Sequence, residues 1–192
     1  AGLLGAEVPE AYGGPGGSFA HDAVITRQSG LAGTDGWGGP LHNAIVVPYV
    51  LHYGNEEQKR RLLPKLVSGE LVGAIAMTEP GAGSDLQNIR TAAVKSGNGY
   101  AITGQTTFIT NGHTANLIVL AAKTDPSLGA KGVSLFLIET DGLDGFRRGR
   151  NLDKIGLKAN DTAELFFDSA KVPASTLLGP AEGQGFAQLM QQ

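Results

Sequence analysis

Apolar residues recur at every third or fourth position through the first third of the chain, which is the spacing that one face of a helix requires. Stretches with this spacing predict helices over 18–31, 41–52 and 55–68. Ser18 is a suitable N-terminal cap for the first helix, which carries Ala20, Val24 and Ile25 on one face. Pro48 interrupts the second pattern and weakens its helical character.

The third helix has the clearest start signal. Asn55 is a cap residue, and the two glutamates that follow it stand in the first turn, where the helix dipole favours anions. Gln58 lies three positions after the cap, as in a capping box. Because proline lacks the N–H of the helical ladder, Pro64 is expected to kink or break this helix near its end.

From position 71 onward the pattern changes to short runs rich in β-branched and aromatic residues, separated by Gly, Asn, Asp and Pro turns. Seven runs are expected to be strands: 72–77, 91–95, 100–103, 106–110, 117–123, 133–139 and 163–167. Strands at this spacing favour an antiparallel sandwich or barrel over a parallel sheet with crossover helices.

The order of the elements predicts an α+β fold in three parts. A partial N-terminal helical domain occupies 1–70, a β domain occupies 71–178, and 179–192 begins a C-terminal helical domain. The chain opens without Met and stops inside a helical pattern, so it is expected to be a fragment.

Composition narrows the chemistry. The 192 residues include 15 Lys and Arg against 18 Asp and Glu, and a formal charge of −3 gives no electrostatic basis for binding nucleic acid. The absence of cysteine excludes disulfides, zinc ribbons and thiol nucleophiles, and the four histidines are too scattered for a metal site. No apolar run reaches the roughly 18–20 residues that span a bilayer. Glycine is abundant, with 29 residues, so many backbone segments must approach something closely.

The segment 77–85 is the first candidate site. It follows an expected strand and supplies two glycines, two hydroxyls and two carboxylates within nine residues. Backbone amides freed by glycine, with hydroxyls beside them, can hold the polar edge or the phosphate of a cofactor. A plain turn explains the same composition equally well. The segment is neither a G-x-G-x-x-G nor a G-x-x-x-x-G-K-[ST] loop, so the usual nucleotide-binding motifs give no support.

The segment 108–112 is the second candidate site. Phe108 and Thr110 are two positions apart on an expected strand, so they point to the same face and would present a flat apolar surface with one hydrogen-bonding group. The competing interpretation is a core aromatic beside a strand-end turn, since Asn-Gly is a common hairpin signal.

Several motifs follow one another along nearly the whole chain: VPEAYGG at 8–14, GNEEQ at 54–58, LP at 63–64, SGE at 68–70, AMTEPGAGSD at 76–85, FITNG at 108–112, KIGLK at 154–158, DTAELFF at 161–167, VP at 172–173 and LG at 178–179. In this order they resemble the acyl-CoA dehydrogenase family, flavoproteins that desaturate acyl-CoA thioesters between the α and β carbons. The stretches 156–159 and 161–167 most resemble its long-chain branch. The resemblance implies a helical domain, a middle β domain and a C-terminal four-helix domain.

The resemblance also implies where FAD binds. The implied contacts are Ile75, Ala76, Met77, Thr78, Gly83, Ser84, Phe108, Ile109 and Thr110. Thr78 would bond the pyrimidine end of the isoalloxazine ring system, and Gly83 and Ser84 would lie near the pyrophosphate. Phe108 and Thr110 would pack on the ring and hydrogen-bond near its N5. Many relatives carry Trp where Phe108 stands, and Phe keeps the apolar face.

Substrate contacts are implied at Ser84, near the thioester arm, and at Ala130 and Lys131, where a lysine suits the phosphates of CoA. A solvated loop lysine explains Lys131 equally well. In the long-chain branch, the resemblance places the catalytic glutamate about one helical turn beyond Gln192. This chain is therefore expected to be inactive alone.

The implied activity is FAD-dependent dehydrogenation of medium- to long-chain acyl-CoA in fatty-acid β-oxidation: a carboxylate takes the α-proton and the flavin takes the β-hydride. An electron-transferring flavoprotein is the implied acceptor, and a homotetramer is the implied assembly. The protein would be cytoplasmic in a bacterium and would lie in the mitochondrial matrix of a eukaryote. The alternatives are a flavin oxidase of the same fold and a noncatalytic module that binds acyl-CoA or protein.

Overall fold

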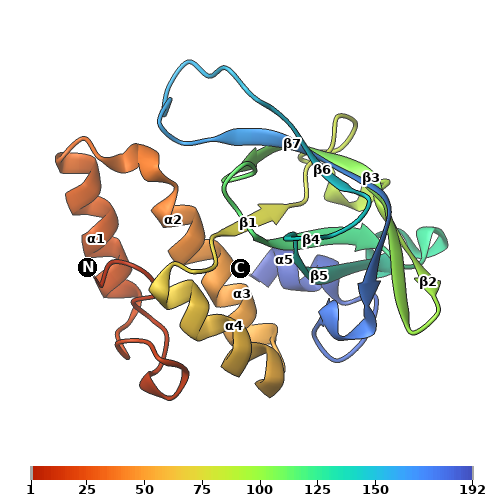
Figure 1. The fold of residues 1–192 in the computed structure, drawn as a ribbon, viewed down its shortest axis with the longest axis horizontal. Coiled ribbons are helices and arrows are strands. Elements are labelled where there is room, and N and C mark those ends of the chain that lie inside the picture. Colours follow the sequence, from red (N-terminus) through yellow and green to blue (C-terminus); the bar gives the residue numbers. More distant parts are fainter. Residues whose placement is uncertain (1, 192) are drawn as a thin grey trace.

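The computed structural model describes residues 2–191. Helices occupy the N-terminal third, a sheet occupies most of the remainder, and one helix follows the sheet, which confirms the predicted α+β fold (Figure 1). The α-helices are α1 Phe19–Leu31, α2 Gly39–Leu41, α3 Val47–Tyr53, α4 Glu56–Ser68 and α5 Gly185–Gln191. Short 3-10 helices are η1 Glu10–Tyr12, η2 Asp35–Trp37, η4 Leu86–Asn88, η5 Pro126–Gly132 and η6 Ala174–Thr176.

The helix predicted over 41–52 makes up most of a continuous helical segment, 39–53, which contains a π-helix. The π-helix η3 covers His42–Val46 and joins α2 directly to α3. Its wider turn is closed by the amide of Val47, which donates to the carbonyl of His42. Pro48, which cannot donate to an earlier carbonyl, follows this turn immediately. The irregular turn is therefore at the point where the proline removes one bond of the α-helical ladder.

Helix α4 begins at the predicted cap. The amide of Gln58 donates to Asn55 Oδ1 over 2.8 Å, and the amide of Asn55 donates back to Gln58 Oε1 over 3.0 Å, which completes the capping box. A kink or a break was expected at Pro64. The break is wrong, because the helix continues to Ser68, and the kink stays a prediction. An internal proline costs about 3 kcal/mol, whereas each fully buried leucine contributes about 1.5–3 kcal/mol. Three fully buried leucines on this helix outweigh the proline: Leu62, Leu63 and Leu66.

Within residues 2–191, eight strands form one sheet, in the order β6-β7-β3-β2-β4-β5-β8, with β1 paired to β4. They are β1 Gly73–Ala76, β2 Ala92–Ser96, β3 Gly99–Thr110, β4 Leu117–Lys123, β5 Val133–Glu139, β6 Phe146–Asn151, β7 Thr162–Pro173 and β8 Leu177–Leu178. The two runs expected over 100–103 and 106–110 are a single strand, β3. Strands β6 and β8 were not predicted. The sheet is mostly antiparallel, but β1 and β2 both pair with β4 in parallel.

Alternation along the central strands divides the core in two. In β4, Leu117 and Val119 belong to a cluster shared with the N-terminal helices, whereas Ile118 and Leu120 belong to a cluster enclosed by the sheet. Because β4 is buried on both faces from 117 to 122, its sequence over these residues is an unbroken apolar run. None of the helices within residues 2–191 has the length and apolarity to cross a bilayer.

Candidate functional site

Strand β1 delivers the chain into the loop 77–85. All four residues of β1 are buried, so the side chains of Ile75 and Ala76 belong to the core. Of the residues predicted to bind the cofactor from this strand, these two have only main-chain atoms to offer. Met77 and Thr78, at the start of the loop, are partly exposed.

Thr78 fixes the loop to strand β3. Its hydroxyl donates to the carbonyl of Thr107 over 2.5 Å, and the amide of Thr107 donates to the carbonyl of Thr78 over 2.8 Å. Thr107 immediately precedes Phe108, so this pair of bonds joins the two predicted segments of the site. Because the Thr78 hydroxyl donates its only proton to Thr107, it can act toward a ligand only as a hydrogen-bond acceptor.

Glu79 makes the loop rigid from within. Its carboxylate accepts hydrogen bonds from the amides of Arg90 over 2.7 Å and Thr91 over 2.8 Å. Its backbone pairs with Ala82 in both directions, which closes a tight turn. With both carboxylate oxygens bonded to backbone amides, Glu79 has a structural role.

The glycines of this loop face open space. No heavy atom lies within 4 Å of the position that a Cβ would take at Gly81 or Gly83, and neither has a positive φ. Ser84 beside them is exposed. Nothing within the described residues requires glycine at these two positions, which is expected where a bound group approaches the backbone closely.

Phe108 stands on strained backbone. Its φ is 59°, in the left-handed region, at a bulge where the β3–β7 register shifts between Thr106 and Ile109. Its side chain is 71% exposed, so the interpretation as a core aromatic is wrong. A left-handed backbone costs a non-glycine residue about 1 kcal/mol or more, and such strain is typical of functional sites.

Phe108 and Thr110 line one cavity of about 500 Å³, as their spacing predicted. Ile109 between them is buried in the core, so its side chain does not reach this cavity. The other wall comes from the loop between β6 and β7, which supplies Leu152, Asp153, Lys154, Gly156, Leu157 and Asn160, with Thr162 at its end.

The β6–β7 loop was not recognised as part of the site. Figure 1 shows it projecting from the sheet toward the side of the N-terminal helices. Its sequence signal is a glycine between two exposed apolar residues, Ile155 and Leu157. From the sequence alone, the motif over 154–158 indicates only the family resemblance.

Ala130 and Lys131 lie in η5, which packs against η4. Because η4 directly follows the loop 77–85, the predicted substrate residues are at the same end of the β domain as Ser84. Lys131 is exposed, in agreement with either interpretation made from the sequence.

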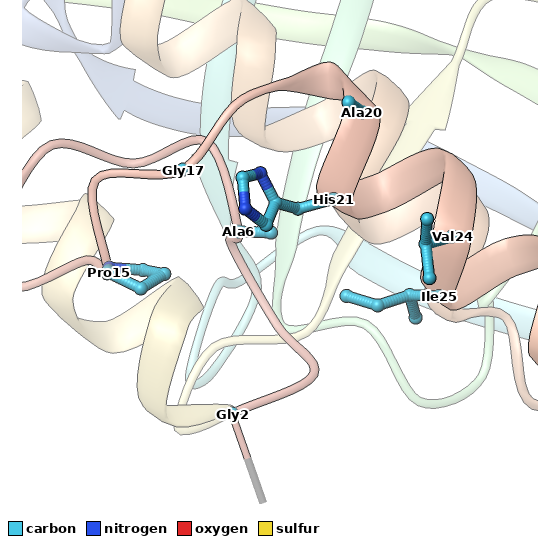
Figure 2. Close-up of a pocket in the computed structure, with 8 residues that line it drawn as sticks. All are labelled: Gly2, Ala6, Pro15, Gly17, Ala20, His21, Val24 and Ile25. Carbon is cyan, nitrogen blue, oxygen red and sulfur yellow. The ribbon is translucent and has the colours of Figure 1, made fainter.

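A second cavity, of about 470 Å³, lies between the N-terminal segment and α1 (Figure 2). It is lined by Gly2, Ala6, Pro15, Gly17, Ala20, His21, Val24 and Ile25. The three apolar residues predicted on one face of α1 thus line an open cavity together. His21 is the one titratable side chain among these described lining residues, and its Nδ1 accepts the amide of Ser18 over 3.0 Å. The imidazole caps the helix.

His42 also has a structural role. It is 3% exposed, its Nδ1 accepts the amide of Gly73 over 3.0 Å, and its Nε2 lies 3.0 Å from the carbonyl of Leu66. These contacts require a neutral ring with the proton on Nε2. Burial lowers the pKa of this imidazole below its usual value. Among the residues that the structure describes, no three His, Asp or Glu side chains are grouped to hold a metal ion.

Two family descriptions match the chain, one on each side of the boundary between helices and sheet. "Acyl-CoA dehydrogenase, N-terminal domain" matches residues 1–70, and "Acyl-CoA dehydrogenase, middle domain" matches residues 74–170. The chain therefore belongs to the acyl-CoA dehydrogenase family, a family of FAD-dependent oxidoreductases.

Among individual relatives, the chain is 47% identical to the long-chain specific acyl-CoA dehydrogenase of Sus scrofa mitochondria, over 100% of this chain and 44% of that protein. The solved acyl-CoA dehydrogenase of Geobacillus kaustophilus is 55% identical with a TM-score of 0.94, over 99% of this chain and 50% of that one. A structure described as an FAD-dependent dehydrogenase is 30% identical with a TM-score of 0.88, over 98% and 51%. The chain spans about half the length of these relatives.

Proposed function

We propose that this chain is the N-terminal and middle part of an FAD-dependent acyl-CoA dehydrogenase that introduces an α,β double bond into medium- to long-chain acyl-CoA in fatty-acid β-oxidation. The observation that carries the proposal is Phe108, an exposed aromatic held on strained backbone beside Thr110 at the mouth of a cavity. The 47% identity to a long-chain enzyme supports the chain-length class.

The residues present fit FAD. An exposed flat side chain offers a packing surface to a fused aromatic ring system, and Thr110 next to it offers a hydroxyl. Gly81 and Gly83 leave room at the backbone of the neighbouring loop, where Ser84 adds a donor suited to the pyrophosphate. Bound FAD would supply the acceptor for the β-hydride.

Each residue then has a physical role. Phe108 would cover one face of the ring and exclude water, and Thr110 would hydrogen-bond near N5. The Thr78 hydroxyl donates its proton to the carbonyl of Thr107, so it would accept a ring N–H at the pyrimidine end. Glu79 holds the loop in place through the backbone amides that it accepts.

We place the proton-accepting carboxylate outside this chain. Glu79 is engaged with two backbone amides, and Asp85 receives a hydrogen bond from the side-chain amide of Asn88 in its own loop. Ser84, Ala130 and Lys131 would contact the CoA portion of the substrate. An electron-transferring flavoprotein as acceptor, a homotetrameric assembly and a mitochondrial matrix or bacterial cytoplasmic location complete the proposal.

The test compares a loop glycine with its alanine variant in the complete parent protein. Gly83→Ala is expected to leave the stability of the apoprotein unchanged, because the new methyl group meets no neighbour, but to weaken FAD binding. Gly30→Ala, at a glycine of α1 that is equally open, is the matched control and should leave FAD affinity unchanged.

Activity gives the second measurement. The complete protein should be yellow and should reduce a dye acceptor with long-chain acyl-CoA, whereas the 192-residue chain with added FAD should show no turnover. A correctly folded, colourless complete protein contradicts the proposal, and hydrogen peroxide as the main product would indicate an oxidase instead.

A further inference from the structure

The loop between β6 and β7 is closed at its neck by backbone and side-chain bonds. The amide of Leu152 donates to the carbonyl of Thr162 over 2.8 Å, and the amide of Thr162 donates to Asn151 Oδ1 over 2.9 Å. Within the loop, the amide of Asn160 donates to the carbonyl of Leu157 over 3.0 Å, which closes a turn. A loop tied at both ends is preorganised, so contacts made by it would cost little ordering entropy.

Lys154 crosses the loop from inside. Its ammonium donates to the carbonyl of Asn160, and to Thr162 Oγ1 over 2.9 Å. A half-buried lysine that donates to two groups six and eight residues further along fixes the shape of the segment between them. The Lys154 side chain therefore links the two arms of the loop, and we call it the strap. Lys154 lines the same cavity as Phe108.

The loop presents features that its own packing does not explain. Leu157 has a φ of 48° and is 57% exposed, an unusual combination for a branched apolar residue. Gly156 has no positive φ, and no heavy atom lies within 4 Å of the position of a Cβ there.

The glycines of the whole chain put Gly156 in context. Only four of the 29, all within the described residues, combine open space at the Cβ position with the absence of a positive φ: Gly30, Gly81, Gly83 and Gly156. Gly30 lies in an exposed helix, and Gly81 and Gly83 lie in the loop already assigned to FAD. Gly156, the fourth, lines the cavity across from Phe108. An open glycine at this position is explained if a ligand approaches that wall as well.

We propose that the cavity-lining residues of this loop form a second wall of the FAD ring site, opposite Phe108 and Thr110, and that Lys154 is the residue that positions this wall. The inference rests on the proposed function, since it takes the ring system to be at Phe108. The cavity of about 500 Å³ is within the size range of small-molecule and cofactor sites.

The experiment measures FAD dissociation constants and visible flavin spectra on the apo form of the complete parent protein. Lys154→Met is expected to weaken FAD binding by about tenfold, since it removes two hydrogen bonds of the strap, and to blur the fine structure of the flavin band. Lys158→Met is the matched control. It removes the same charge from an exposed position of the same loop that does not line the cavity, and should change affinity less than about twofold.

Gly156→Ala tests the wall independently of the strap, because its methyl group meets no protein atom. It is expected to leave the melting temperature of the apoprotein unchanged and to weaken FAD binding. Equal effects of Lys154→Met and Lys158→Met would show that charge alone is responsible, and unchanged affinity in Gly156→Ala would show that the loop does not touch the ring. Either result overturns the inference.

Phe108→Ala separates this inference from the proposed function. If Phe108→Ala weakens FAD binding and alters the flavin spectrum while the loop variants do not, the loop inference alone fails. If Phe108→Ala changes neither, the ring does not lie at Phe108, and both the site assignment and the second wall are wrong.

Discussion

Gln58 connects the helical part of the molecule to the sheet, and its replacement is a sensitive test of how the two are joined. Its side chain is 3% exposed. Beyond its bond with Asn55, its Nε2 donates to the carbonyl of Ser175 over 2.8 Å and to that of Leu177 over 3.0 Å. One amide thus caps α4 and holds the segment that leads into β8.

Gln58→Met keeps the length and approximate volume of the side chain but removes all three of its hydrogen bonds. Each bond contributes about 1 kcal/mol net, and an acceptor left without a partner in a partly buried position adds to the loss. The expected destabilisation is about 2–4 kcal/mol. For a chain of this size, 1 kcal/mol corresponds to a shift of roughly 2–4 °C, so the melting temperature should fall by on the order of 10 °C.

The assay is urea unfolding of the 192-residue chain followed by circular dichroism, with Asn55→Ala as control. Asn55→Ala removes the cap bond to the amide of Gln58 but leaves the two bonds to Ser175 and Leu177, so it should cost only about 1 kcal/mol. The reasoning is refuted if the two variants lose the same free energy of unfolding, because the contacts to Ser175 and Leu177 would then contribute nothing measurable.

Three further variants test other features. Ser169→Asn should raise the free energy of unfolding by about 0.5–1 kcal/mol in a urea titration, since Ser169 has a φ of 52° and asparagine tolerates that region better. Phe108→Gly should stabilise the apoprotein by about 1 kcal/mol in the same titration while abolishing FAD binding, which calorimetry would detect as opposite changes. The buried imidazole of His42 has a pKa lowered from 6.5, so the unfolded chain binds its proton first and stability should fall as the pH drops below 6.5. His42→Gln should remove that part of the pH dependence of unfolding.

The elements predicted best are those whose burial is visible in the sequence as a run or a periodic pattern of apolar residues. The bounds of β4 and β5 were predicted to the residue, because both strands consist mainly of buried apolar residues and end at a charged residue, Lys123 or Glu139, that precedes a polar turn. Strand β6 was missed, since Phe146-Arg147-Arg148-Gly149-Arg150 has no apolar alternation. It is an edge strand held by pairing with β7 and by the guanidinium of Arg147, 3.7 Å from the ring centre of Phe166. Such tertiary contacts leave no local signal.

The same distinction applies to the candidate site: local patterns are visible in the sequence, whereas contacts between distant residues are not. The spacing of Phe108 and Thr110 correctly indicated a shared face, but the left-handed backbone that exposes Phe108 depends on the pairing of β3 with β7. Likewise, Lys154 was an ordinary lysine in a motif until the fold brought Asn160 and Thr162 within its reach. Residues that act through partners distant in the chain are found only when the partners are placed.

The number of glycines does not say why each one is needed, but the fold does. A Cβ at Gly99 or Gly132 would lie 2.0 or 1.7 Å from a backbone oxygen, so those glycines allow one part of this protein to approach another. Gly83 and Gly156 have no such neighbour and no left-handed backbone, so their small size benefits nothing within the described residues. The 29 glycines therefore differ in the reason for their presence. Gly99 and Gly132 are needed for folding, whereas Gly83 and Gly156 are best explained by a group that approaches the backbone from outside, so alanine at these two positions should alter ligand affinity and leave stability intact.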